Sequence, residues 1–300
     1  MNSTLAGSVE RPARAGGADW ITALAFRPRK ESWVAASPEG FHKLFRASDD
    51  PVRDWLDPAC TATAAREYAD MQLLHRAAAD VCLPVRRDHA CIVYPYLSGP
   101  DLRATLRTRG GGGVEGAAGL AAAMRVLAHV HTTREDLSCY AAKAYPASSY
   151  LPPDLDVLRR IAARPRRLCL EGFEVRNFRY DRRRDAWCFF DPQAISLGVA
   201  ENDVARFIVS LLMVNWGHGG GLRIWTAFDA NALLAAYERA AGDTLDATLL
   251  AYFTHESIAM RRHFAERALG GLRGTARLLG RPYLANYFRQ LDHWAHQHEF

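Results

Sequence analysis

The side chains best suited to chemistry gather in residues 168–193, LCLEGFEVRNFRYDRRRDAWCFFDPQ. Asn177 precedes one short apolar run, and Asp191 follows a second run fourteen positions later, where it opens an Asp-Pro turn. The charged segment DRRRD between the runs predicts the tip of a β-hairpin. A hairpin brings its two ends together, so the side-chain oxygens of Asn177 and Asp191 are expected to meet at its base. Oxygen ligands of this kind are those that Mg²⁺ takes in proteins.

The elements that must position this hairpin follow a simple order along the chain. Residues 20–97 are predicted to form short strands and one helix, with strands at 21–26, 32–37, 40–46 and 90–97 and the helix at 61–79. Later helices are predicted at 102–109, 115–133 and 151–165 and from 201 to the end, with Asp101 or Ser98 as a cap. A small mixed region before a large helical one indicates an α+β fold and not an alternating parallel one.

The bulk composition excludes several classes of protein. The 300 residues are 49% hydrophobic and 24% charged, which suits one large domain or two lobes with a sizeable core. The net charge of +5 is too mild to indicate a nucleic-acid partner. No apolar run is long enough to span a membrane, and no secretory signal is recognisable. The six cysteines form no C-x-x-C pair, which favours buried, reduced thiols in a cytoplasmic protein.

The order of elements and three short motifs resemble the protein-kinase-like fold, and its aminoglycoside phosphotransferase branch in particular. LEGFEVRN lies where that branch has H-G-D-x-x-x-x-N, so that Asn177 matches the final Asn. FFDPQ supplies an Asp at the metal-binding turn, Asp191, and ENDVARF supplies the D-[LV]-A segment with Asp203. The resemblance covers about residues 20–215.

This resemblance implies a two-lobe fold, with a nucleotide-binding lobe at 19–97 and a mostly helical lobe at 98–300, while residues 1–18 are expected from their own sequence to form a flexible tail. It implies a phosphotransferase that uses ATP and Mg²⁺ and acts on a small hydroxylated acceptor such as a sugar, a glycolipid or a natural product. Lys43 would hold phosphate oxygens and Glu67 would hold Lys43 by a charge-assisted bond. The adenine would bond to the backbone of residues 93–96, at Tyr94 and Tyr96. Asn177 and Asp191 would hold the metal.

The sequence departs from the family pattern at the catalytic loop. Gly172 stands where the family has its catalytic Asp, and Leu170 stands where it has His. Glu171 is the first candidate to take the place of that Asp, and Glu174 is the second. The first hairpin turn, RPRKE, lacks the family's glycines, although its cations could attract phosphates by charge. Two alternatives therefore stay open: a pseudokinase that binds a nucleotide or a partner without transfer, and a nucleotidyltransferase on the same fold.

Further polar residues carry structural expectations. Asp203 is expected to cap a helix beginning at Val204 and to bond the backbone of the catalytic loop. His129 and His131 lie two apart on a helix and so do not share a face, which favours a polar network over a metal site. The glycine-rich loop at 215–223 could shape an acceptor pocket, with the aromatic residues Trp216, His218 and Trp225.

Overall fold

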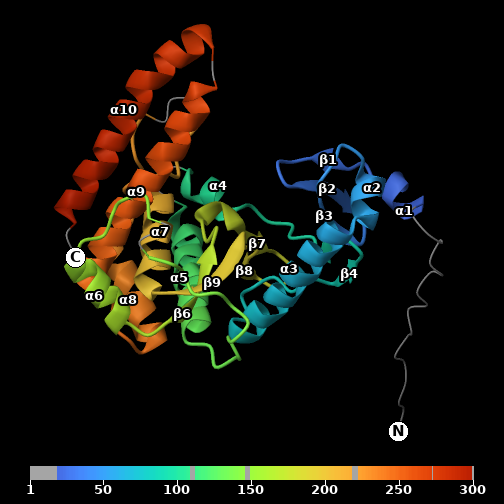
Figure 1. The fold of residues 1–300 in the computed structure, drawn as a ribbon, viewed down its shortest axis with the longest axis horizontal. Helices are drawn as coiled ribbons and strands as arrows, with labels where there is room; N and C mark the ends of the chain where they lie inside the picture. The colour runs from blue at the N-terminus through green and yellow to red at the C-terminus, as the bar shows by residue number, and fades with distance from the viewer. Residues whose placement is uncertain (1–18, 109–111, 146–148, 218–221, 272, 299–300) are drawn as a thin grey trace. The chain divides into compact units, whose positions relative to one another are not determined.

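The computed structural model describes residues 19–108, 112–145, 149–217, 222–271 and 273–298 (Figure 1). The tail predicted at 1–18 therefore lies outside the described residues. The chain divides into an N-terminal unit, which ends at Tyr68 and also includes Pro84–Tyr96, and a C-terminal unit of Ala69–Leu83 and Leu97 onward. The first boundary falls within helix α3 (Pro58–Ala77). Within the described ranges, no helix has both the length and the apolar character needed to cross a membrane.

The N-terminal unit is built on an antiparallel sheet with the strand order β1-β2-β3-β5-β4 (Figure 1). The strands are β1 (Arg27–Pro28), β2 (Ser32–Ser37), β3 (Gly40–Phe45), β4 (Arg86–Asp88) and β5 (Cys91–Tyr94). The strands predicted at 32–37, 40–46 and 90–97 are thus confirmed, whereas β4 was not predicted. Strand β3 is central, and Lys43 lies opposite Val34 on one side and Ile92 on the other. The alternating residues of β3 divide between the core and the other face, as expected for a half-buried strand.

One predicted strand is wrong, because residues around 21–26 form the short helix α1 (Asp19–Ala23) instead. Ile21 is fully buried in a cluster with Trp33, Leu44 and Trp55. A helical turn places Trp20 beside Ile21 against this core, so tertiary packing overrides the strand propensity of the segment. Trp55 comes from a second unpredicted helix, α2 (Pro51–Leu56), whose first turn is capped by Asp50.

The C-terminal unit is mostly helical. Its helices beyond α3 are α4 (Leu102–Leu106), α5 (Gly113–His131), α6 (Leu155–Ala163), α7 (Ala200–Leu212), α8 (Ala230–Ala241), α9 (Ala247–Gly270) and α10 (Gly274–Gln297). Helix α7 is the centre of this unit, since every residue in it except Arg206 is buried. Figure 1 shows α9 and α10 side by side and extending beyond the other helices of the unit. Of the two predicted caps of α4, Asp101 is the one used.

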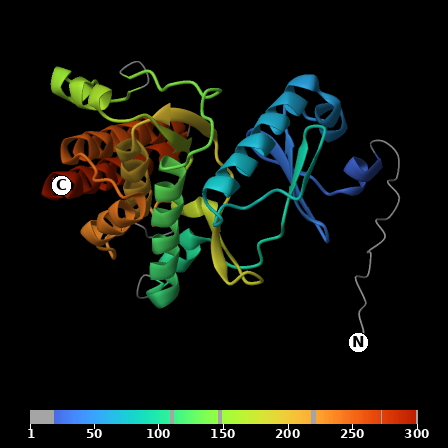
Figure 2. The same ribbon diagram turned by 90° about the horizontal axis from the view of Figure 1, so that it is seen from below.

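Four short strands lie among these helices. Strand β6 (Arg167–Glu171) pairs with β9 (Ala194–Gly198), and the hairpin of β7 (Phe178–Asp181) and β8 (Ala186–Phe189) is inserted between them. The predicted hairpin is therefore confirmed, and Figure 2 shows it next to α5. A cluster of phenylalanine rings anchors it to α7, with centroid separations of 4.9–5.4 Å among Phe173, Phe178, Phe189 and Phe207 for the closest pairs. None of the six cysteines, all of which lie in described ranges, forms a disulfide, and all but Cys139 are buried.

Candidate active site

The two ends of the β7–β8 hairpin meet at its base. The side-chain Nδ2 of Asn177 donates to the carbonyl oxygen of Gly172 at 2.6 Å and lies 3.4 Å from that of Asp191. The backbone nitrogen of Phe190 in turn donates to the carbonyl oxygen of Asn177 at 2.9 Å. Asn177 is buried, and no described residue donates to its Oδ1. The expected convergence of Asn177 and Asp191 is therefore present in the backbone that carries them.

The residues at this base suit a hard cation. Asp191 is half-buried and has a φ of 61°, in the left-handed region that Asp and Asn enter more readily than other non-glycine residues. This conformation turns the chain sharply between β8 and β9. One carboxylate and one amide oxygen are a donor set that matches Mg²⁺, which keeps several waters and takes few protein ligands. Asn177 and Asp191 are thus the residues that could hold such an ion.

Gly172 occupies a position that excludes a larger residue. Its φ is 83°, a conformation that L side chains rarely adopt. A Cβ at this position would lie 2.8 Å from Cγ and 3.1 Å from Cδ of Gln193. The backbone nitrogen of Gln193 donates to the carbonyl oxygen of Glu171 at 2.9 Å, which holds the two segments together. Gln193 therefore fills the space that a carboxylate at residue 172 would enter.

The two candidate replacements for the missing carboxylate have different environments. Glu171 ends strand β6 with 45% of its side chain exposed, and its Oε1 lies 4.0 Å from the Nζ of Lys143. Glu174 has only 13% of its side chain exposed and forms ion pairs with Arg176 at 2.8 Å and with Arg261. Burial alone would raise the pKa of Glu174, but Arg261 and Arg176 outweigh it and hold that pKa below its usual value. Glu174 is thus poorly suited to accept a proton, which leaves Glu171 as the better candidate.

The N-terminal unit holds the second group of predicted residues. The Nζ of Lys43 donates to both carboxylate oxygens of Glu67, at 2.9 and 2.8 Å. The hydroxyl of Tyr94 donates to Oε1 of Glu67 at 2.7 Å. Only 14% of the Lys43 side chain and 11% of the Glu67 side chain are exposed, so the pair is well shielded from water. The expected Lys43–Glu67 contact is present, whereas Tyr96 has 52% of its surface exposed and its role stays a prediction.

Asp203 supports the catalytic loop from α7. The expectation that it caps a helix is wrong, since α7 begins at Ala200 and Asp203 lies within its first turn. The expected bond to the loop backbone is confirmed, because Oδ2 of Asp203 accepts from the nitrogen of Leu170 at 2.6 Å. The same oxygen lies 3.3 Å from Nε2 of His131, whose Nδ1 lies 2.8 Å from the hydroxyl of Tyr237.

The buried side chains of His131, Cys169 and Asp203 lie close together. One potential metal-ligating atom from each of the three lies within 4.8 Å of the other two. Both ring nitrogens of His131 and the Oδ2 of Asp203 already have hydrogen-bond partners. A structural role therefore accounts for this cluster, as the sequence indicated for His131. His129 differs from its neighbour in being exposed.

Several solved structures share this arrangement of elements. A crystal structure of a Ralstonia eutropha JMP134 protein, described as an aminoglycoside phosphotransferase, matches with a TM-score of 0.57 at 14% identity, over 92% of this chain and 97% of that one. A choline/ethanolamine kinase family protein from Mesorhizobium loti matches with a TM-score of 0.52 at 15% identity, over 90% and 87% of the two chains. Choline kinase LicA from Streptococcus pneumoniae matches with a TM-score of 0.50 at 12% identity, over 90% and 98%.

This chain has the protein-kinase-like fold of small-molecule kinases. At these identities the comparison shows the fold and leaves the activity to be argued from the site. No family model matches the sequence, and no curated protein matches it significantly. The kinase-like fold nevertheless confirms the α+β assignment and the resemblance on which the candidate residues were chosen.

Two aromatic residues of the predicted acceptor pocket pack within the helical part of the kinase-like fold. The ring of Trp216 lies 4.8 Å from that of Tyr287 and 5.8 Å from that of Phe288, both on α10. Trp225 stacks on Phe228 at 5.5 Å. The third, His218, lies outside the described residues. The acceptor pocket in this region stays a prediction.

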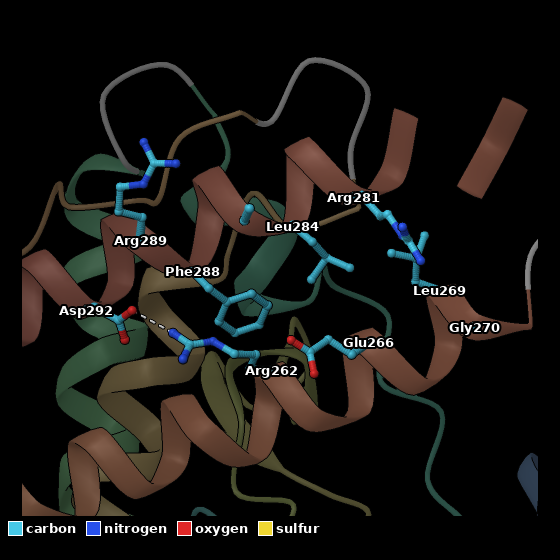
Figure 3. Close-up of a pocket in the computed structure, with 10 residues that line it drawn as sticks. Arg262, Glu266, Leu269, Gly270, Arg281, Leu284, Phe288, Arg289 and Asp292 are labelled. Carbon is cyan, nitrogen blue, oxygen red and sulfur yellow. Dashed lines mark hydrogen bonds and ion pairs between the residues drawn. The ribbon is translucent and has the colours of Figure 1, made fainter. Parts of the chain in front are cut away.

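A cavity of about 510 Å³ lies between α9 and α10 (Figure 3). Figure 3 shows Phe288 on α10 pointing toward α9, next to the ion pair of Arg262 with Asp292 at 2.6 Å. The residues that line the cavity are Arg262, Glu266, Leu269, Gly270, Arg281, Leu284, Ala285, Phe288, Arg289 and Asp292. None of these is a predicted site residue, and the charges are of both signs. The cavity therefore adds no residue to the candidate active site.

Proposed function

We propose that the protein transfers a phosphoryl group from ATP, with Mg²⁺, to a hydroxyl group of a small acceptor. The observation that carries this proposal is the meeting of Asn177 and Asp191 at the base of one hairpin within a kinase-like fold. Phosphoryl transfer asks little covalent chemistry of the protein and depends on positioning and charge stabilisation. The side-chain oxygens of Asn177 and Asp191, one at each end of the hairpin, would supply the central requirement, a place for the cation.

Each binding residue has a role that follows from its contacts. The oxygens of Asn177 and Asp191 would hold Mg²⁺, which when bound neutralises phosphate charge. Lys43 would donate to phosphate oxygens, and Glu67 keeps its ammonium in place through two charge-assisted bonds. Tyr94 fixes Glu67 through its hydroxyl, and the backbone of residues 93–96 would bond the adenine.

Glu171 would orient the acceptor hydroxyl and take its proton. In the transfer, the acceptor oxygen forms a bond to the terminal phosphorus of ATP, the bond from that phosphorus to the bridging oxygen breaks, and ADP leaves with those electrons. The hydroxyl proton passes to the Glu171 carboxylate. General-base assistance of this kind contributes roughly 10²–10⁴ in rate. The half-exposed position of Glu171 and the paired state of Glu174 support this choice.

The test is Mg²⁺-dependent transfer from γ-labelled ATP by the full chain to a panel of small alcohols, sugars and hydroxy acids. We expect labelled product with the wild type, a loss of about 10²–10⁴ in rate for Glu171→Gln, and no product for Asp191→Asn. Product formed at the wild-type rate by Glu171→Gln would remove Glu171 from the mechanism. A protein to which ATP does not bind in the presence of Mg²⁺ would contradict the proposal as a whole.

The second candidate function is that of a nucleotide-binding module without transfer. The specific observation in its favour is Gly172, whose conformation and contact with Gln193 leave no place for the family's carboxylate. Tight, Mg²⁺-dependent ATP binding with no product from any acceptor would favour this alternative. The nucleotidyltransferase alternative is distinguished by mass spectrometry, because the product would then carry AMP and not a phosphate.

A further inference from the structure

Lys143 approaches the catalytic loop from a segment that the proposed mechanism does not use. Its backbone is fixed along β9, where the nitrogen of Leu197 donates to the carbonyl oxygen of Ala141 at 2.9 Å. The nitrogen of Lys143 donates back to the carbonyl oxygen of Leu197 at 2.7 Å. Because β9 also pairs with β6, this segment and Glu171 are held in one small sheet. The position of Lys143 relative to Glu171 is thus set by backbone hydrogen bonds within the C-terminal unit.

The side chain of Lys143 is mostly shielded from water, and its ammonium has no hydrogen-bond acceptor among the described residues. Only 9% of the side chain is exposed, and the Nζ makes no hydrogen bond to any residue in the part of the chain that the structure describes. Its nearest carboxylate oxygen is Oε1 of Glu171 at 4.0 Å, and it lies 5.7 Å from the ring centre of Tyr145. An ammonium has three donors and no acceptor, so ligand oxygens at this partly shielded position would find donors that no described residue fills.

A second cation adds to the positive charge here. Burial lowers the pKa of Lys143, and the charge of Arg206 lowers it further, while Asp203 and Glu171 act in the opposite direction. The Nη2 of Arg206 contacts only a weak acceptor, the sulfur of Met260 at 3.8 Å, and its buried Nε has no partner among the described residues. Lys143 and Arg206 are therefore two neighbouring cations with donors that no strong acceptor among the described residues fills.

Two neighbouring carboxylates, those of Asp203 and Glu174, are already engaged by other groups. The Oδ2 of Asp203 already accepts from Leu170 and lies within reach of His131. Glu174, the other acid of the loop, is neutralised by Arg176 and Arg261. Glu171 is thus the half-exposed carboxylate that lies beside the ammonium of Lys143.

We propose that the acceptor is an anionic alcohol, whose carboxylate or phosphate oxygens bind Lys143 while its hydroxyl donates to Glu171. This inference rests on the proposed phosphotransferase function and names its substrate class. The 4.0 Å between Nζ and Oε1 lets adjacent oxygens of one ligand lie within hydrogen-bond distance of both groups. A cationic acceptor, such as the choline named for one structural neighbour, would face like charges here.

The chain is well suited to a direct test, because it contains only three lysines, Lys30, Lys43 and Lys143. Acetic anhydride labelling of the full chain, without nucleotide, followed by peptide mass spectrometry, reports the reactivity of each amine. The probes are glycerate, glycerol 3-phosphate, glycerol and choline, small alcohols that differ in charge. Lys30 is the internal control, since its side chain is 92% exposed and, among the described residues, pairs only with Glu31.

We expect glycerate or glycerol 3-phosphate to slow the labelling of Lys143 several-fold and to leave Lys30 unchanged. Protection by glycerate alone identifies a carboxylate site, and protection by glycerol 3-phosphate alone identifies a phosphate site. Glycerol and choline should protect neither amine. Protection of Lys143 by choline, equal protection of Lys30, or no protection of Lys143 by either anion would overturn the proposal.

A variant series gives a second, independent readout. Lys143→Met should weaken binding of the protecting anion about 10–100-fold in calorimetry, because a hydrogen bond to a charged group is lost. Lys143→Arg should retain part of the affinity, which a merely structural role would not predict. Wild-type affinity in folded Lys143→Met overturns the assignment. Because neither experiment contains ATP, a failure here is distinct from a failure of the phosphotransfer itself.

Discussion

The side chain of Gln193 lies against the backbone of Gly172, so that a Cβ on Gly172 would lie 2.8 Å from Cγ of Gln193. The contact joins the position that corresponds to Asp in the H-G-D-x-x-x-x-N pattern to the turn that follows Asp191. The φ of 83° at Gly172 adds a second barrier that no repacking of Gln193 removes. The conformation of the loop at Gly172 therefore requires a residue without a side chain.

The substitution Gly172→Asp, which introduces the residue of the H-G-D-x-x-x-x-N pattern, should destabilise the protein and not increase its activity. Strain at a left-handed φ costs about 1–3 kcal/mol, with Asp at the lower end because it tolerates this region better than most side chains, and the clash with Gln193 adds to it. Urea unfolding of both proteins measures the difference. When Gly172→Asp is combined with Gln193→Ala, the protein should regain only the part of the lost free energy of unfolding that comes from the clash. A stable and more active Gly172→Asp variant would contradict this account of the loop.

Loss of the Asp191 carboxylate should abolish the dependence of ATP binding on Mg²⁺. Asp191→Asn is the suitable change, because Asn tolerates the φ of 61° and removes only the charge. The stabilisation of the fold by ATP, measured as a thermal shift, should then be equal with and without Mg²⁺.

A matched control for Asp191 exists at the other end of the same hairpin. Asp185 also has a left-handed φ, of 52°, and lies at the tip, where it accepts a hydrogen bond from Tyr180. Asp185→Asn should keep the full Mg²⁺ effect on ATP binding. Equal losses in both variants would mean that the hairpin and not the Asp191 carboxylate is responsible.

Removal of the Glu67 charge should weaken ATP binding through Lys43. Glu67→Gln leaves the shielded Lys43 ammonium without its anion, which should also lower the free energy of unfolding by about 1–3 kcal/mol. Tyr94→Phe is the control, since it removes one hydrogen bond to Glu67 and keeps the ion pair, at a cost of about 0.5–1.5 kcal/mol. Calorimetric ATP titration should rank the affinities as wild type, Tyr94→Phe, Glu67→Gln. An unchanged affinity in Glu67→Gln would separate this ion pair from nucleotide binding.

Asp54 should make the fold sensitive to acid. It is buried, and its Oδ2 accepts from Nε1 of Trp33 at 2.8 Å. Burial alone would raise the pKa of Asp54, but hydrogen bonds from Trp33 and Ser48 together hold it below its usual value. The stability that this provides is present above the unfolded pKa of about 3.9 and is lost as the pH falls through the folded pKa.

The variant Asp54→Asn tests this contribution. At neutral pH it should reduce the free energy of unfolding by about 1–3 kcal/mol, because the acceptor for Trp33 becomes weaker. Below the unfolded pKa the difference between the two proteins should shrink, and chemical unfolding across a pH series measures it. A constant difference at all pH values would show that Asp54 does not titrate as described.

Features that depend on a few neighbouring residues could be predicted from the sequence. The alternation in β3 placed Lys43 on a defined face, and the two apolar runs around DRRRD predicted the hairpin that joins Asn177 to Asp191. The cap of α4 by Asp101 was among the two expected. Local periodicity and turn chemistry determine these features, because backbone geometry repeats every two residues in a strand and every 3.6 in a helix.

The tertiary structure alone decided which acids are available for chemistry. Glu171 and Glu174 are equivalent by type and both close to Asn177, but Arg261 comes to Glu174 from a helix far along the chain. Likewise Gln193 reaches Gly172, and Lys143 reaches Glu171, only because β6, β9 and the segment before residue 144 lie together. Such contacts join residues that no local pattern relates, and the electrostatic character of a carboxylate depends on those neighbours.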